Sequence, residues 1–280
     1  MIRDQSLASR LWRIAIWAVV IVFLVNLIGL IASVVLNSFA TRWLGTWLPV
    51  AFTTRWYASA WEEFQLGDIL WVTFEVVFAV VAISGLLGVT AAYALARRNF
   101  PGKRFVVLVF LLPLLVPPLT YGIPLATLLY QVGLGGTFWG VVIANLVPAI
   151  PFVVLVMIPF VEQIDPRIEA AARVFGASTT SLFLRVLLPL LLPGMLAALL
   201  LVLVRTIAMF ELTFLVSGPA SQTLVVALYY AVFAAGVRAS QSIDAMAVIY
   251  MVTTLVWLLV ALRFVSPTQI VARAKQQSAH

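Results

Sequence analysis

The sequence predicts an all-α membrane protein with six transmembrane helices. Hydrophobic residues make up 64% of the 280 residues and charged residues only 10%, a composition outside the range of ordinary soluble domains. The apolar runs are continuous and about 20 residues or longer, as membrane-spanning helices require, whereas the strands of a β-barrel alternate over about ten residues. The basic residues gather in some of the connecting segments and are sparse in others, which predicts an orientation in the membrane.

The six predicted spans follow the apolar runs in chain order. They are about 14–36, 69–96, 105–130, 138–160, 187–216 and 243–263. A further apolar run, 223–235, is too short to cross and predicts an outer helix lying against the membrane or dipping into it. This arrangement predicts a cytoplasmic N-terminus at 1–13, a six-helix domain at 14–265 and a basic cytoplasmic tail at 266–280. Most basic residues then lie on the inner side; the exceptions are Arg42, Arg55, Arg205 and Arg238.

The region between the first two spans is polar and rich in tryptophan. It contains Trp43, Trp47, Trp56 and Trp61. Tryptophan at this density is typical of a membrane interface, where its amphipathic ring sits at the level of the headgroups. A packed outer loop would explain the same residues equally well, and the sequence does not decide between the two.

The polar segment 161–186, between the fourth and fifth spans, predicts a helix, a bend and a second helix. Asp165 can cap a helix whose first turn holds Pro166, a position where proline costs no hydrogen bond. Gly176 is suited to end that helix, and Ser178 can cap the next one. We expect this pair of helices to lie at the inner membrane surface.

This segment resembles the cytoplasmic signature loop of ABC importer permeases that are served by a solute-binding protein. The family pattern is Glu-Ala-Ala, a few residues, Gly, nine residues, then an aliphatic residue, one more residue and Leu-Pro. Gly176 is followed by nine residues and then by Val186 to Pro189, which fits the pattern. Counted back from Gly176, the usual glutamate position falls on Ala170, and Glu169 lies one residue earlier. The resemblance covers about 69–265.

The resemblance implies a type I ABC importer permease fold in which this loop contains a coupling helix that docks into a groove of an ATPase subunit. The expected docking residues are Glu169, Ala170, Ala171, Ala172, Gly176 and Ala177. Small alanine side chains would let another surface come close. Glu169 and Arg173 are spaced i,i+4 and would brace the helix.

The resemblance also implies the partners and the location of the chain. They are a second permease subunit, identical or a sister chain, two ATP-binding cassette ATPase subunits, an extracytoplasmic solute-binding protein and the lipid of a bacterial inner membrane. The ATPase must be another chain, because the GKR tract at Gly102 lacks the remaining residues of a phosphate-binding loop. We therefore expect a translocation subunit with no catalytic residue, cofactor or metal, and no nucleic-acid partner.

Three ionisable residues fall inside predicted spans: Glu75, Arg205 and Glu211. Such groups are costly in hydrocarbon, so each should face the bundle interior or a cavity and find a partner. On a continuous helix Arg205 and Glu211 would point about 240° apart, so one of them is expected to meet Glu75 or a neighbouring subunit. Glu211 could line the solute path with Phe210 and Thr213, or these charges could form an ion pair that fixes the bundle.

Prolines interrupt the third span. They are Pro113, Pro117, Pro118 and Pro124, and they predict a kinked or partly unwound helix. Irregular backbone at membrane depth survives only against protein or a water-filled cavity. The stretch is therefore either a wall of the translocation path or a bundle helix with proline kinks.

Weaker signals bear on the solute. The segment 209–219 and the RVFGAS tract resemble permeases for polyamine, ferric iron and phosphonate, whereas sugar permeases more often carry aspartate at the position of Phe175. A glutamate in the path would suit a cation, so a polyamine or similar small polar molecule is expected, with a carbohydrate or polyol as the alternative.

Two other classes of protein are alternatives to the importer. A self-contained ion-coupled secondary transporter, with Glu75 and Glu211 as proton or cation sites, would predict internal repeats, and none is convincing. An intramembrane enzyme lacks its residues, because the sole histidine is His280 and no Gly-x-Ser-x-Gly motif occurs.

Overall fold

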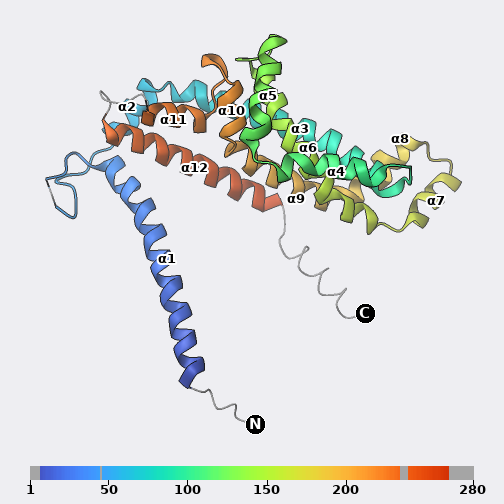
Figure 1. Cartoon of the computed structure of the whole chain (residues 1–280), viewed down its shortest axis with the longest axis horizontal. Helices are drawn as coiled ribbons and strands as arrows, with labels where there is room; N and C mark the ends of the chain where they lie inside the picture. The colour runs from blue at the N-terminus through green and yellow to red at the C-terminus, as the bar shows by residue number, and fades with distance from the viewer. Residues whose placement is uncertain (1–6, 45, 234–238, 265–280) are drawn as a thin grey trace. The chain divides into compact units, whose positions relative to one another are not determined.

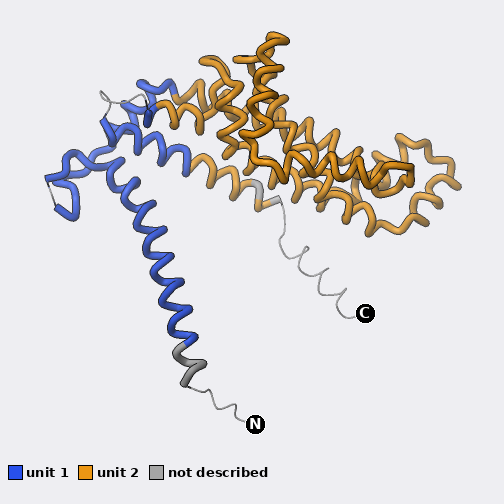
Figure 2. Tube along the Cα trace, in the orientation of Figure 1, with its two compact units in different colours: residues 1–65, 231–251 blue, residues 66–230, 252–280 orange. Residues whose placement is uncertain are grey.

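The computed structural model describes residues 7–44, 46–233 and 239–264, so the predicted tail at 266–280 and the start of the predicted N-terminal segment lie outside the described residues. The chain divides into two compact units, residues 1–65 with 231–251 and residues 66–230 with 252–280 (Figure 2). The predicted domain boundaries stay predictions. Each unit is described by itself.

The first unit contains α1 (Leu7–Phe39), which holds the first predicted span, and the short helix α2 (Arg55–Glu63). In the loop between them, the Trp43 indole donates a hydrogen bond to the Asn37 side chain at 2.7 Å, although Trp43 is 40% exposed. Trp56, in the first turn of α2, is half-buried, and its indole donates to the Ala40 carbonyl at 2.7 Å. The Trp47 side chain is 99% exposed. Of these three residues Trp56 is packed within the unit, and the choice between a membrane interface and a packed loop stays a prediction.

The second unit is built on three long apolar helices, α3 (Leu66–Arg97), α6 (Phe138–Glu162) and α9 (Leu188–Ile207), which pack on one another (Figure 1). Their facing sides form the main hydrophobic core. At Gly88 of α3, an added Cβ atom would lie 2.6 Å from Val153 of α6. Glycine is therefore needed at this close contact between α3 and α6.

The third predicted span is a bent pair of helices. α4 (Lys103–Leu115) and α5 (Pro118–Gln131) meet at an angle of 99°. The break falls at Val116 and Pro117, which confirms the predicted interruption, because proline both lacks an amide donor and restricts the residue before it. With this pair counted as one span, the described residues hold up to six helices able to cross a membrane, the last being α12 (Ser240–Phe264).

The prediction of one continuous fifth span over 187–216 is wrong. α9 ends at Ile207, and a separate helix, α10 (Glu211–Val216), begins after Phe210. The sequence between Gly194 and Gly218 contains neither proline nor glycine, so local propensity does not cause the break. α10 packs on α5 and α6 instead of continuing the line of α9, and tertiary packing overrides propensity here.

The segment from α10 to α11 agrees with the sequence. α10 ends before the Ser217-Gly218-Pro219 turn, which leads through a short 3₁₀ turn, η2 (Pro219–Ser221), into α11 (Leu224–Phe233). α11 has 10 residues, about 15 Å at 1.5 Å per residue. The structure therefore confirms an apolar helix too short to span a bilayer.

Candidate functional site

The loop between α6 and α9 has the predicted local structure. A side-chain oxygen of Asp165 accepts a hydrogen bond from the Arg167 amide at 2.9 Å and caps α7 (Pro166–Val174). Gly176 adopts a φ of +83° at the bend, a conformation that favours glycine. The Ser178 hydroxyl accepts from the Ser181 amide at 3.2 Å and caps α8 (Thr179–Leu182). A π-helical turn, η1 (Phe183–Leu187), then joins α8 to α9.

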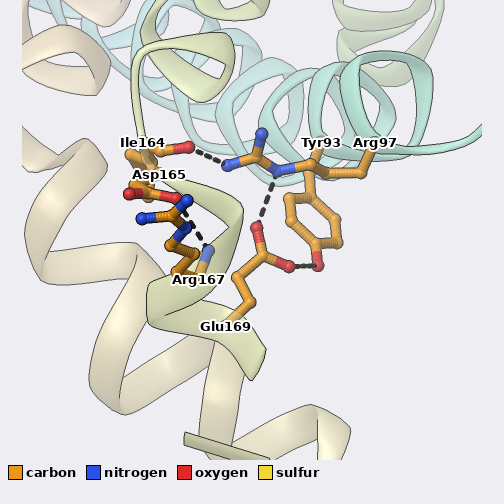
Figure 3. Close-up of polar contacts among 6 residues, drawn as sticks. All are labelled: Tyr93, Arg97, Ile164, Asp165, Arg167 and Glu169. Carbon is orange, nitrogen blue, oxygen red and sulfur yellow. Dashed lines mark hydrogen bonds and ion pairs between the residues drawn. The ribbon is translucent and has the colours of Figure 1, made fainter. Parts of the chain in front are cut away.

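Glu169 points from α7 toward the end of α3 and is only 9% exposed (Figure 3). Its Oε1 accepts a hydrogen bond from Arg97 Nε at 2.6 Å, and its Oε2 accepts one from the Tyr93 hydroxyl at 2.7 Å. Arg97 also donates through Nη2 to the Ile164 carbonyl at 2.6 Å. The ion pair of Glu169 is thus with Arg97, and the predicted pairing with Arg173 along the helix is wrong.

The sequence analysis missed Tyr93 and Arg97. Their signal was a spacing of i,i+4 at the inner end of an apolar run, which places both side chains on one face of α3. The Glu169 carboxylate is buried between α7 and α3, and it binds Tyr93 and Arg97 because a buried charge needs charge-assisted hydrogen bonds. An ion pair between Glu169 and the exposed Arg173 would be weaker, because water screens the attraction between exposed charges.

Around its bend, the loop exposes apolar side chains at the surface of the chain. Val174 is 85% exposed and Phe175 is 90% exposed. Ala170, Ala171 and Gly176 are also exposed, whereas Ala172 and Ala177 are partly buried. We call Ala170, Ala171, Val174 and Phe175 the elbow surface. Its two large side chains were not among the predicted docking residues, although consecutive large apolar residues at the end of a polar helix were visible in the sequence.

A small, partly open pocket lies beside the break between α9 and α10. Its lining residues come from α6, from α9 and from the break: Asn145, Pro148, Ala149, Phe152, Val202, Arg205, Thr206 and Met209. Arg205 is the charged residue among them, and its guanidinium lies over the Phe152 ring at 4.8 Å. This contact is a cation–π interaction, which holds the charge without a carboxylate partner.

Most of the predicted path residues gather near this break. Asn145, 2% exposed, donates a hydrogen bond at 3.1 Å to the hydroxyl of Thr213, which is 1% exposed. Phe210 packs on Phe214 and on Tyr229, with ring centroids 5.1 and 4.9 Å away. Glu211 lies half-buried in the first turn of α10.

Glu75 is not part of this group. It lies half-buried on α3 and does not line the pocket. Within the described part of the chain, no ion pair joins Glu75, Arg205 or Glu211 to another residue. Arg205 and Glu211 therefore form no ion pair with Glu75, and the alternative, a partner in a neighbouring subunit, stays a prediction. Because α9 and α10 are separate helices, the angle expected on a continuous helix does not apply to Arg205 and Glu211.

These features define a class of protein: an all-helical, multi-pass membrane protein with a capped helix–bend–helix loop before its fifth span. Residues 84–275 match the family of binding-protein-dependent transport system inner membrane components, and the chain belongs to this family. It is an ABC importer permease. The fold agrees with that of a bacterial ABC transporter involved in the import of the acidic polysaccharide alginate, at a TM-score of 0.74 and 17% identity over 92% of this chain and 98% of that one.

Curated relatives name different solutes. The spermidine/putrescine permease PotC of Escherichia coli K12 is 26% identical over 239 residues, which is 85% of this chain and 84% of PotC. The diacetylchitobiose permease NgcG of Streptomyces coelicolor is 31% identical over 153 residues, so that match spans about half of each chain, 53% and 51%. The similarities define a transport permease of the inner membrane rather than an enzyme, and they leave the solute open.

Proposed function

We propose that this chain pairs with a second permease subunit, identical or a sister chain, to form the solute path of an ATP-driven importer. Two separate ATPase chains dock on the coupling loops, an extracytoplasmic binding protein delivers the solute, and both termini lie in the cytoplasm. The observation that carries the proposal is the elbow surface, where Val174 and Phe175 are 85% and 90% exposed on a loop that is otherwise capped and braced.

The chemistry of the elbow surface fits a protein partner. Large exposed apolar side chains beside small ones are typical of an interaction site, and Ala170 and Ala171 let a facing backbone approach closely. Gly176, with its φ of +83°, turns the chain directly after Phe175. In the proposed cycle, ATP binding brings the two ATPase subunits together, the two coupling loops follow, and the cavity turns outward; hydrolysis resets it.

The proposed solute is a polyamine or a similar small polar molecule. The similarity to PotC over most of both chains supports it. Glu211 and the rings of Phe210 and Phe214 lie at the helix break, and aromatic faces with a carboxylate can hold an ammonium group. A carbohydrate or polyol is the second candidate, because the charged residue lining the pocket is Arg205, which would repel a cation.

Cross-linking tests the docking surface. The chain contains no cysteine, so single cysteines can be introduced at Ala171 in the elbow surface and, as a matched control, at the exposed Val132 in the predicted outer loop. Both variants are assembled with the ATPase and the partner permease. We expect cross-links to the ATPase from Ala171→Cys only; an active complex without them would overturn the proposed docking.

Transport in proteoliposomes tests the source of energy and the solute. The purified chain is reconstituted with and without the ATPase, the partner permease and the binding protein, and uptake of putrescine is compared with that of a chitin disaccharide. We expect uptake of putrescine that requires ATP and the ATPase. Uptake of the disaccharide instead would favour the second solute, and uptake on an ion gradient by the chain alone would overturn the importer.

A further inference from the structure

Three parts of the coupling loop converge on the last two turns of α3. Arg97 binds the Ile164 carbonyl just after α6 and the Glu169 carboxylate in α7. Tyr93, one turn earlier on the same face, donates to Glu169 and places its ring edge-on against Phe183 of η1, with centroids 5.8 Å apart and planes at 73°. We call these five residues the α3 clamp (Figure 3 draws all of them except Phe183).

The geometry of the clamp fixes its charges firmly. The side chains of Arg97 and Glu169 are only 15% and 12% exposed, so water screens their attraction little. Both carboxylate oxygens of Glu169 are occupied by donors from α3, and hydrogen bonds between ionised groups are stronger than neutral ones. Such a contact holds α7 in one orientation, not merely near the bundle.

The clamp also changes how α7 can move. The chain joins α7 to α6 at one end and to the Gly176 bend at the other. A rod attached only at its ends can rotate about the line between them, whereas a third attachment near its middle removes that freedom. α3 in turn packs against α6 and α9 over their length.

We propose that Arg97 is a positioning residue for energy coupling: through Glu169 it makes α7 and α3 move as one body, so that a displacement of the elbow surface reaches the core of the bundle. This inference rests on the proposed function. Without the clamp, α7 would rotate on its loops, and part of each ATPase movement would be lost before it reached α3.

The first test measures solute imported per ATP hydrolysed by the whole transporter in proteoliposomes. Arg97→Gln keeps a polar side chain but shortens it and removes its charge, and Arg98→Gln, which makes the same change at the adjacent, exposed residue, is the matched control. We expect the ratio to fall about tenfold in Arg97→Gln, the scale of a typical coupling between sites, and to stay unchanged in Arg98→Gln. The ratio does not depend on how much complex assembles. An unchanged ratio in Arg97→Gln would overturn the inference.

A double substitution sharpens this test. Arg97→Gln with Glu169→Gln should lower the ratio no further than either change alone, since both remove the same contact. Additive losses would show that the two side chains act separately and would overturn the clamp. A wild-type complex that imports no solute with ATP would instead overturn the proposed function, so the two failures are distinguishable.

The second test follows the clamp directly and does not need transport. Spin labels are placed at Arg98→Cys and Arg167→Cys, one on each side of the clamp, in the assembled complex. With the clamp intact, we expect one narrow distance distribution by electron paramagnetic resonance that is the same with and without ATP; in the Arg97→Gln background it should broaden. A distance that changes with nucleotide while Arg97 is present would overturn the inference.

Discussion

The coupling loop and the helix break between α9 and α10 both carry charged side chains near the bundle, and they hold them differently. At the loop, Glu169 is 9% exposed and has donors on both oxygens. At the break, Arg205 faces a pocket against Phe152, and Glu211 is half-buried; within the described residues neither forms an ion pair. A paired charge fixes geometry, whereas a charge without a carboxylate or guanidinium partner is free to meet a solute or another subunit.

The largest expected effect is at the bend of the loop. Gly176→Val places a β-branched residue at a φ of +83°, a strain of about 1–3 kcal/mol that the bend would relieve by changing direction. We expect uptake to fall at least about tenfold while membrane insertion, measured by the yield of folded chain, persists. Gly176→Asn should restore much of the uptake, because asparagine tolerates this conformation.

Gly102→Val is the matched control for that prediction. Gly102 has the same φ of +83°, and an added Cβ atom would likewise meet no atom within 4 Å. The backbone strain is therefore the same, but Gly102 lies in the turn between α3 and α4 and is not part of the coupling loop. Equal losses of uptake in both variants would mean that strain alone, and not the direction of the coupling loop, matters.

Replacing one glutamate by glutamine in each region tests whether the paired charge stabilises the fold and the charge without an ion pair serves transport. Glu169→Gln leaves the buried Arg97 charge without its carboxylate, and we expect a loss of about 1–3 kcal/mol, visible as a lower melting temperature of the purified complex. Glu211→Gln breaks no ion pair in the described structure, so its melting temperature should stay the same while uptake changes. The reverse pattern would contradict the roles assigned to the two regions.

A smaller effect is expected at the polar contact between α6 and α10. Asn145→Leu removes the hydrogen bond to Thr213 and leaves that buried hydroxyl without its donor, a cost of about 0.5–1.5 kcal/mol for a neutral hydrogen bond. Thermal unfolding followed by tryptophan fluorescence checks it. Thr213→Val combined with Asn145→Leu should cost less than the two single changes added together; full additivity would show that this contact does not hold α10 in place.

The smallest effect on stability is expected at the elbow surface. Phe175→Ser alters a side chain that is 90% exposed. The free energy of unfolding of the isolated chain should therefore change by no more than about 0.5 kcal/mol, and its melting temperature should barely move. Binding of the ATPase, measured by co-purification, should nevertheless weaken. Val132→Ser, at a side chain 59% exposed in the predicted outer loop, is the control and should leave both quantities unchanged; a large melting shift from Phe175→Ser would show that the ring packs within the chain.

Features that depend on neighbouring residues, or on the length of an apolar run, could be predicted from the amino-acid sequence alone. Asp165, Gly176 and Ser178 act within three residues of their own positions, so the capped helix, bend and helix could be predicted. The spans followed from their length and apolar composition, and the prolines of the third span predicted its interruption. In each case the interaction that decides the structure is local or averaged over one segment.

Features that join distant parts of the chain could not be predicted in this way, because they depend on how the helices pack. Glu169 pairs with a residue 72 positions away, and its competing partner at i,i+4 was the one that spacing favoured. The break at Ala208–Phe210 occurs without proline or glycine, because α10 gains its contacts with α5 and α6 by leaving the line of α9. Local propensities differ by less than about 1 kcal/mol per residue, so packing and the burial of a charge outweigh them.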